Sequence, residues 1–145
     1  MQIIKKNLKF KGNLIRRGLT NKIILHHAAG KNLTVEKIHF IHLQKGWAGI
    51  GYHFYITKDG KIYEGRPLNM IGAHCIGHNV TSIGICLEGD FRKEVPTEKQ
   101  IESLKELVNQ LIKDYKLNKE KDIYNHSDLY KTLCPVYNLR EEVLK

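Results

Sequence analysis

Two short apolar runs are the first feature of the hydrophobic pattern, and they predict buried strands. Residues 22–27 and 81–89 are rich in isoleucine and leucine, and residues 122–126 form a shorter extended stretch. Partly continuous apolar runs are typical of strands that are covered on both faces of a sheet. We therefore expect the run at 81–89 to occupy a central position.

A hairpin signal lies between these two runs. Residues 51–57 and 62–64 carry aromatic and β-branched side chains, and Asp59-Gly60 lies in the turn between them. An Asp-Gly pair favours the tight turn that joins two antiparallel strands. The sheet is therefore predicted to contain both parallel and antiparallel neighbours.

Apolar side chains recur every three to four residues in three other segments, which predicts helices. Residues 34–43 begin with a threonine suited to the N-cap. Residues 97–112 carry the longest apolar stripe, and a threonine followed three residues later by glutamine predicts a capping box at their start. Residues 139–144 predict a final short helix. Strands that alternate with helices indicate an α/β fold, with a central mixed β-sheet flanked by helices.

The composition is that of one globular domain. A length of 145 residues fits one domain of ordinary size, so residues 1–145 are expected to form a single catalytic domain. The amino-terminal stretch has no apolar run as long as a secretory signal needs, and no segment reaches the about 18 consecutive apolar residues of a membrane span. We therefore expect synthesis in the cytoplasm without a signal peptide.

The formal net charge of +9 implies attraction to polyanions. These could be nucleic acids or the anionic polymers of a bacterial cell wall. Lysine and arginine are scattered along the whole chain, and no zinc-finger, helix-turn-helix or RNP-type pattern organises them. This distribution argues against nucleic acid as the partner.

The spacing of histidine and cysteine suggests a metal site. A polar loop ending in Pro135 separates His126 from Cys134, so a chain reversal could bring an imidazole and a thiolate together. A third ligand from a strand end, such as His26, would leave a tetrahedral zinc one open position for water, as catalytic sites require. Spacing alone leaves His26 and His27 open, because strand alternation points them to opposite faces. An odd number of cysteines without an export signal favours reduced thiols or metal ligation over disulfides.

Six sequence blocks, in order along the chain, carry a resemblance to a known family. They are residues 24–29, 51–56 with Asp59-Gly60, 63–66, 72–74, 79–89, and His126-Ser127-Asp128 through Thr132-Leu133-Cys134-Pro135. Several ordered blocks are much more specific than one motif. Over residues 20–136 the chain resembles the type 2 N-acetylmuramoyl-L-alanine amidases, which include phage lysozymes of amidase type and peptidoglycan recognition proteins.

The resemblance implies a zinc ion at the strand ends, held by His26, His126 and Cys134. A zinc ion addresses both difficulties of amide hydrolysis, because it polarises the carbonyl and acidifies water. The residue-based interpretation of His27 is then a core histidine or one that supports a ligand.

The resemblance also implies three catalytic residues. Tyr52 is implied to face the metal, where it would orient or deprotonate the attacking water or stabilise the oxyanion. His74 is implied to hydrogen-bond the substrate or the tetrahedral intermediate. Thr132 stands where some phage enzymes have a catalytic lysine and others a threonine. The plain alternatives are a half-buried strand tyrosine for Tyr52 and a solvated loop histidine for His74.

Other candidate residues receive structural interpretations. Cys86 stands where recycling amidases of the wider family have a catalytic glutamate, which excludes glutamate-based activation of water at that position. Glu88 shares its strand face and is interpreted as structural. His39 and His42 lie three residues apart on a predicted helix but have no third ligand, so we interpret them as surface histidines. Trp47 would either line a sugar or peptide groove or act as a partly buried anchor.

The function implied by the resemblance is hydrolysis of the amide between N-acetylmuramic acid and L-alanine in peptidoglycan. An endolysin or autolysin made in the cytoplasm would reach the cell wall after release, for example through a holin. One alternative is a peptidoglycan-binding module without activity, although such relatives typically lack the cysteine that Cys134 supplies here. Another is an amidase that also inhibits RNA polymerase through residues 5–17, for which a solvated basic face is the more economical interpretation.

Overall fold

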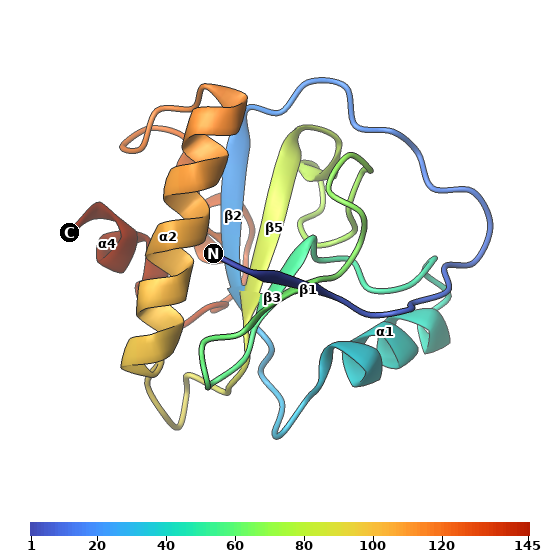
Figure 1. The fold of residues 1–145 in the computed structure, drawn as a ribbon, viewed down its shortest axis with the longest axis horizontal. Helices are drawn as coiled ribbons and strands as arrows, with labels where there is room; N and C mark the ends of the chain where they lie inside the picture. Colours follow the sequence, from blue (N-terminus) through green and yellow to red (C-terminus); the bar gives the residue numbers. More distant parts are fainter.

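A six-stranded sheet forms the centre of the computed structural model, which describes residues 1–145 (Figure 1). Its order is β1-β4-β3-β5-β2-β6. The strands are β1 (Ile3–Lys5), β2 (Lys22–His27), β3 (Phe54–Ile56), β4 (Ile62–Glu64), β5 (Ser82–Leu87) and β6 (Ile123–Asn125). The β3–β4 hairpin is antiparallel and every other neighbouring pair is parallel, which confirms the mixed sheet.

Helices cover both faces of this sheet. They are α1 (Val35–Gln44), α2 (Glu98–Tyr115), α3 (His126–Leu129) and α4 (Leu139–Leu144), together with the 3-10 turn η1 (Asn79–Thr81). In Figure 1, α2 and α4 lie on one side of the strands and α1 on the other. None of the helices has the length and apolarity needed to cross a membrane.

The central strands separate two apolar clusters. Ile23 and Ile85 belong to the larger cluster, which includes the buried stripe of α2. Cys86 belongs to the smaller cluster with Val35 and Ile38 of α1. Every residue of β5 is buried, as its apolar run predicted. Because His26 pairs in register with Cys86, the end of β2 is held next to the middle of the sheet.

The long helix α2 matches its prediction closely. The Thr97 hydroxyl oxygen accepts a hydrogen bond from the backbone N–H of Gln100, and the Gln100 side chain accepts one from the backbone N–H of Thr97. This capping box satisfies two donors that a helix start otherwise leaves unpaired. The Gln100 amide then donates to the main-chain oxygens of Ile56 and Glu88, so the start of α2 is tied to two central strands.

Two short elements and one charged residue differ from expectation. Strand β1, which pairs in parallel with β4, had not been predicted. Residues 127–135 had been expected to form a loop, but helix α3 extends to Leu129. The basic stretch at 5–17 is not solvated throughout, because Arg17 is buried and donates to the main-chain oxygen of Met70. The other lysines and arginine of that stretch are exposed, as a solvated face requires.

Candidate metal centre

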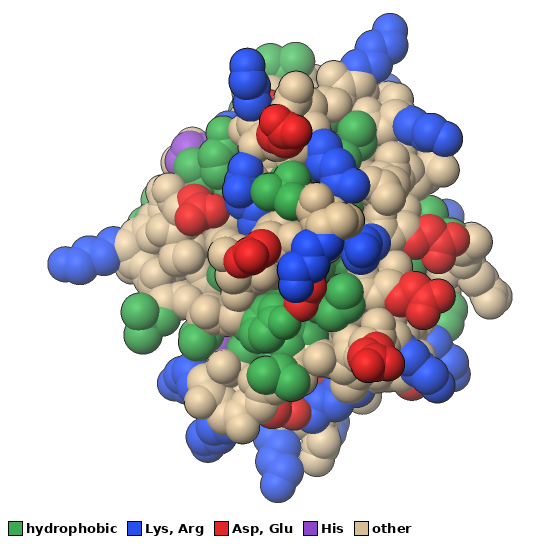
Figure 2. All heavy atoms as spheres, turned by 90° about the vertical axis from the view of Figure 1, so that its left-hand side faces the viewer, with side chains coloured by type: hydrophobic (Ala, Val, Ile, Leu, Met, Phe, Trp, Pro, Cys, Tyr) green, Lys and Arg blue, Asp and Glu red, His purple; other side chains and the backbone are tan.

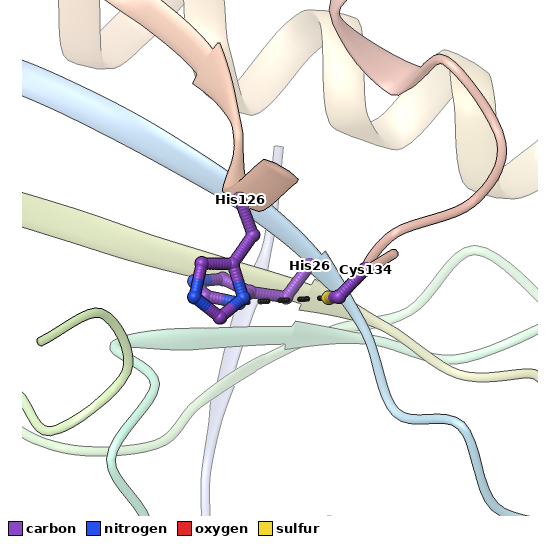
Figure 3. Close-up of side chains that lie close together, drawn as sticks. All are labelled: His26, His126 and Cys134. Atoms are coloured by element: carbon purple, nitrogen blue, oxygen red, sulfur yellow. Dashed lines mark hydrogen bonds between the residues drawn. The ribbon is translucent and has the colours of Figure 1, made fainter. Parts of the chain in front are cut away.

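Three side chains converge at the carboxyl ends of the parallel strands β2 and β6 (Figure 3). His26 lies near the end of β2, His126 follows β6 as the first residue of α3, and Cys134 lies in the loop after α3. Their potential ligand atoms all lie within 4.8 Å of one another. The Nδ1 atom of His26 is 3.8 Å from the Sγ atom of Cys134. The sheet topology therefore assembles the three residues that the resemblance implied as metal ligands.

One atom of this cluster has the environment of an unused ligand. The Nδ1 atom of His126 is buried and has no hydrogen-bond partner. A buried polar atom without a partner costs about 1–3 kcal/mol, so such atoms are rare without a bound ligand or a functional reason. Two imidazoles and one thiol are also a donor set that suits zinc. The residues present therefore fit a zinc ion.

The protonation of the cluster is set mainly by burial. Burial lowers the pKa of His26 well below its usual value, with His74 and His126 adding to the effect, and it also lowers the pKa of His126. Both rings are thus neutral, as metal ligation requires. Burial raises the pKa of the Cys134 thiol to about 11. Binding of a metal there must release the thiol proton.

The main chain around Cys134 holds its sulfur in place. The Cys134 oxygen accepts from the backbone N–H of Ser127, and its own N–H donates to the hydroxyl oxygen of Thr132, at 2.8 and 3.2 Å. The backbone N–H of His27 points to the Cys134 Sγ at 3.4 Å. Thr132 thus lies beside the cluster and shapes the loop, and its catalytic role stays a prediction.

The geometry separates His26 from His27. His27 lies on the other face of β2, where its Nδ1 accepts a hydrogen bond from the backbone N–H of Phe91 at 3.1 Å and its ring stacks on that of Phe91. The Nδ1 and the ring of His27 are thus already engaged by Phe91. Its neighbour His26 instead presents Nδ1 to Cys134.

Tyr52 stands over the cluster. Its ring centroid lies 5.0 Å from that of His26 and 5.5 Å from that of His42. Burial, assisted by the neighbouring thiols of Cys86 and Cys134, raises the pKa of Tyr52 well above its usual value. The phenol therefore remains a neutral hydroxyl, which is a hydrogen-bond donor.

Two hollows flank the cluster, and both are lined in part by Tyr52 and His126. One, of about 420 Å³, continues toward Trp47 and Tyr130. The other, of about 410 Å³, continues toward Arg92 and contains the remaining two residues of the metal cluster. Trp47 belongs to a groove wall, which is one of its two expected roles. A ligand could thus extend to both sides of the metal centre.

A hollow of about 510 Å³ on the α2 and α4 side is larger but lacks this chemistry. Its walls contain three glutamates, Lys105 and Tyr137, but no histidine or cysteine. Acidic, basic and apolar side chains are interspersed over this face in Figure 2. It therefore offers neither the histidine and cysteine ligands of the candidate metal centre nor a single-sign field for a polyanion.

The interpretation of His39 and His42 as surface residues was wrong. Their exposed fractions are only 7% and 6%. The Nδ1 of His39 accepts from the backbone N–H of Ile50 while its Nε2–H donates to the oxygen of Lys9, at 3.0 and 2.8 Å. The Nδ1 of His42 accepts from the backbone N–H of Gly51 at 2.9 Å. Both histidines anchor loops to α1.

Glu88 has the structural role expected of it. A carboxylate oxygen of Glu88 accepts from the backbone N–H of Lys58 at 2.8 Å, which fixes the hairpin turn. All three cysteines are free thiols, and Cys75 and Cys86 are buried. The plain alternative for His74, a solvated loop histidine, does not hold because His74 is buried and packs edge-on against His26.

Known amidases and peptidoglycan recognition proteins are similar to this chain. The structure of N-acetylmuramoyl-L-alanine amidase LysC from Clostridium intestinale URNW has 40% sequence identity and a TM-score of 0.92, covering 98% of this chain and 95% of LysC. The endolysin of Enterobacteria phage T3 is 33% identical over 132 residues, which cover 86% of this chain and 85% of the endolysin. Peptidoglycan-recognition protein SC2 of Drosophila melanogaster is 33% identical over 129 residues, which cover 83% and 70% of the two chains.

The family comparison agrees with these relatives. The N-acetylmuramoyl-L-alanine amidase family (Amidase_2) matches residues 17–136. That range contains His26, His126, Cys134 and all the blocks that carried the resemblance in sequence. Because the match spans well over half of the chain, this protein belongs to the N-acetylmuramoyl-L-alanine amidase family.

Proposed function

We propose that this protein is a zinc-dependent amidase that hydrolyses the bond between N-acetylmuramic acid and L-alanine in bacterial peptidoglycan. The observation that carries the proposal is the convergence of His26, His126 and Cys134 around an unpartnered buried nitrogen. These three residues would hold the ion. When bound, zinc supplies a Lewis acid that polarises the amide carbonyl and lowers the pKa of water.

The protein side chains supply the remaining parts of the chemistry. The neutral Tyr52 hydroxyl is suited to donate a hydrogen bond to the oxygen that becomes negatively charged when the amide is attacked. Thr132 holds the backbone of Cys134 in place. Tyr52 and Thr132 are the proposed catalytic residues, and His74 is a proposed site residue that contacts His26.

The flanking hollows suit a substrate that continues in both directions from the reacting bond. A muramoyl-alanine amide has sugar on one side and peptide on the other, so it needs room on both sides of the metal. The half-exposed Trp47 and the positively charged Lys45 line one hollow, and Arg92 lines the other. The net charge of +9 would add a general attraction to anionic cell-wall polymers.

We propose further that the protein acts on the wall as an endolysin or autolysin after release from the cytoplasm. The similarity to the T3 endolysin and to LysC supports this proposal. The alternative is a binding module without activity, which the similarity to a peptidoglycan-recognition protein keeps open. The exposed cations of residues 5–16 are accounted for by a solvated face, so inhibition of RNA polymerase is not part of the proposed function.

Digestion of a defined muropeptide tests the proposal. We expect new L-alanine amino termini without new reducing sugar ends, loss of activity in a chelator and recovery on addition of zinc. Mass spectrometry of the products and the metal content of the purified protein are the measurements. New reducing ends would contradict the amidase assignment. Less than about half an equivalent of zinc in protein made with added zinc would favour the binding module.

A further inference from the structure

His74 lies directly behind the metal ligand His26, in a slot that two glycines leave open. A Cβ atom at Gly84 would lie 2.5 Å from the His74 ring, and one at Gly72 would lie 2.8 Å from it. Neither distance is compatible with a real side chain. The β5 strand and the segment before His74 thus make room for an imidazole in contact with His26.

A chain of hydrogen bonds passes through this imidazole. The Nε2 of His26 lies 2.9 Å from the Nδ1 of His74, and the Nε2 of His74 lies 3.2 Å from the Oγ of Ser82. The Ser82 hydroxyl donates to the main-chain oxygen of His78 at 2.6 Å. The chain therefore ends on a carbonyl, a group that only accepts hydrogen bonds.

That carbonyl fixes the donor and the acceptor in each of the hydrogen bonds that lead back from Ser82 to His26. Because the Ser82 hydroxyl gives its only proton to His78, its oxygen must accept from the Nε2–H of His74. The Nδ1 of a neutral His74 then has a lone pair and accepts from the Nε2–H of His26. The free lone pair of His26 is left on Nδ1, the nitrogen that faces Cys134 at 3.8 Å.

We infer that His74 is a positioning residue, which through Ser82 and the His78 carbonyl holds His26 in the tautomer that presents Nδ1 to the metal. The inference rests on the proposed zinc site. Both ring nitrogens of His74 are engaged inside the protein, so this role differs from a contact with the substrate. Partners of this kind orient a ligand and raise its basicity, and their loss typically weakens metal affinity by about 10- to 100-fold.

Three variants separate positioning from substrate contact. His74→Leu removes the acceptor for His26, whereas His74→Asn keeps an amide oxygen close to the position of Nδ1. Ser82→Ala removes the residue that fixes the tautomer of His74. His78→Ala is the matched control, because it retains the main-chain carbonyl and changes only the side chain.

The measurements are the zinc dissociation constant by competition with a chromophoric chelator and kcat at saturating zinc. We expect about 10- to 100-fold weaker zinc binding for His74→Leu, a smaller loss for Ser82→Ala, and affinities near wild type for His74→Asn and His78→Ala. We also expect His74→Asn to keep its kcat when saturated with zinc. Circular dichroism of the metal-free proteins checks folding, and Ser82→Ala decides the question if His74→Leu does not fold.

Two results would overturn the inference alone. One is a folded His74→Leu, or Ser82→Ala in its place, that binds zinc as tightly as the wild type. The other is His74→Asn with normal zinc affinity but a large loss of kcat, which would indicate that His74 contacts the substrate. A wild-type protein that binds no zinc would instead contradict the proposed function, and the inference with it.

Discussion

The two pairs of histidines on either side of Tyr52 differ in what their nitrogens do. His26 of the candidate metal centre is 1% exposed, and His39 and His42 of α1 are 7% and 6% exposed, so burial does not distinguish His26 from the α1 histidines. Both nitrogens of His39 bond to the backbone. The Nδ1 of His126, in contrast, is buried without any partner. An unpaired buried nitrogen within reach of other ligand atoms therefore distinguishes the candidate metal centre from the α1 histidines.

The two groups also contribute to stability with opposite sign. The α1 histidines satisfy backbone donors of the segment at 50–51, whereas the metal centre holds an unsatisfied nitrogen that costs about 1–3 kcal/mol. A ligand that binds only the folded state stabilises it by an amount that rises with the logarithm of the ratio of its concentration to its dissociation constant. The candidate metal centre is thus expected to gain stability when an ion binds.

The largest effect should follow from breaking the metal centre itself. Cys134→Ser should lose zinc and lower amidase activity by at least about a thousandfold, because the pKa of free water is about 15.7 and that of zinc-bound water is about 7. Metal analysis and product release measure both effects. His39→Gln is the control and should keep its full zinc content, because His39 is occupied by the backbone. Loss of zinc in His39→Gln would contradict the distinction between the α1 histidines and the proposed metal ligands.

Tyr52→Phe tests the residue that lies between the two groups. Removal of one hydrogen-bond donor to a developing oxyanion typically lowers kcat by about 10²- to 10³-fold. We expect a loss of this size with an unchanged zinc dissociation constant, since Tyr52 is not among the three ligands. An equal loss in zinc affinity would indicate a structural tyrosine instead.

Leucine substitutions should have different effects on stability at the two sites. His39→Leu leaves the N–H of Ile50 and the oxygen of Lys9 without a partner, so the free energy of unfolding should fall by about 1–3 kcal/mol. His126→Leu removes the unsatisfied nitrogen and should be neutral or stabilising in the metal-free protein. Denaturant unfolding in the presence of a chelator measures both. Equal destabilisation by the two substitutions would contradict the proposed difference between the hydrogen-bonded His39 and the unsatisfied His126.

A pH series tests His42, whose pKa burial lowers from 6.5 to about 4, with smaller contributions from Lys45, Arg66 and His39. The unfolded chain therefore takes up the proton first. The stabilisation is complete above about pH 6.5 and is lost as the pH falls through 6.5 toward 4. His42→Gln, which keeps an acceptor for Gly51, should show a shallower decline. Parallel stability curves would rule out this titration.

Elements with strong local patterns were predictable from the sequence. The apolar run of β5 and the capping box of α2 each depend on neighbouring residues, and both are confirmed. Strand β1 was missed because it has only three residues, at an edge of the sheet, and too few positions to establish a period. The burial of His39 was missed because its partners, Lys9 and Ile50, come from distant loops.

In the site, too, the contacts between residues near one another in sequence were easier to predict than those between distant residues. Spacing drew attention to His126 and Cys134, but choosing His26 over His27 needed the resemblance, and its physical reason is the bond from Phe91 to His27. The bond between His26 and His74 joins β2 to a loop 48 positions later. No local periodicity encodes such a contact, which becomes visible only when the sheet has formed.

The smallest predicted effect concerns backbone strain at Val136, in the loop after α3 that also carries Cys134. Val136 follows Cys134-Pro135 with a φ of 67°, a left-handed conformation that is unfavourable for a β-branched residue. It is also 46% exposed and lines the hollow beside Cys134. Val136→Asn should therefore raise the free energy of unfolding by at most about 1 kcal/mol, because asparagine tolerates this conformation better.

The same substitution shows whether the strained side chain serves the substrate. If Val136 contacts the substrate in the ground state and the transition state alike, Val136→Asn should raise KM and leave kcat unchanged. A more stable variant with an unchanged KM would indicate that the strained conformation of Val136 does not contribute to substrate binding. Residues 126–136 would then carry two local costs, the unpaired nitrogen of His126 and the backbone of Val136, of which a bound ligand would relieve only the first. Helix α1 carries neither: both nitrogens of His39 and the Nδ1 of His42 bond to the backbone.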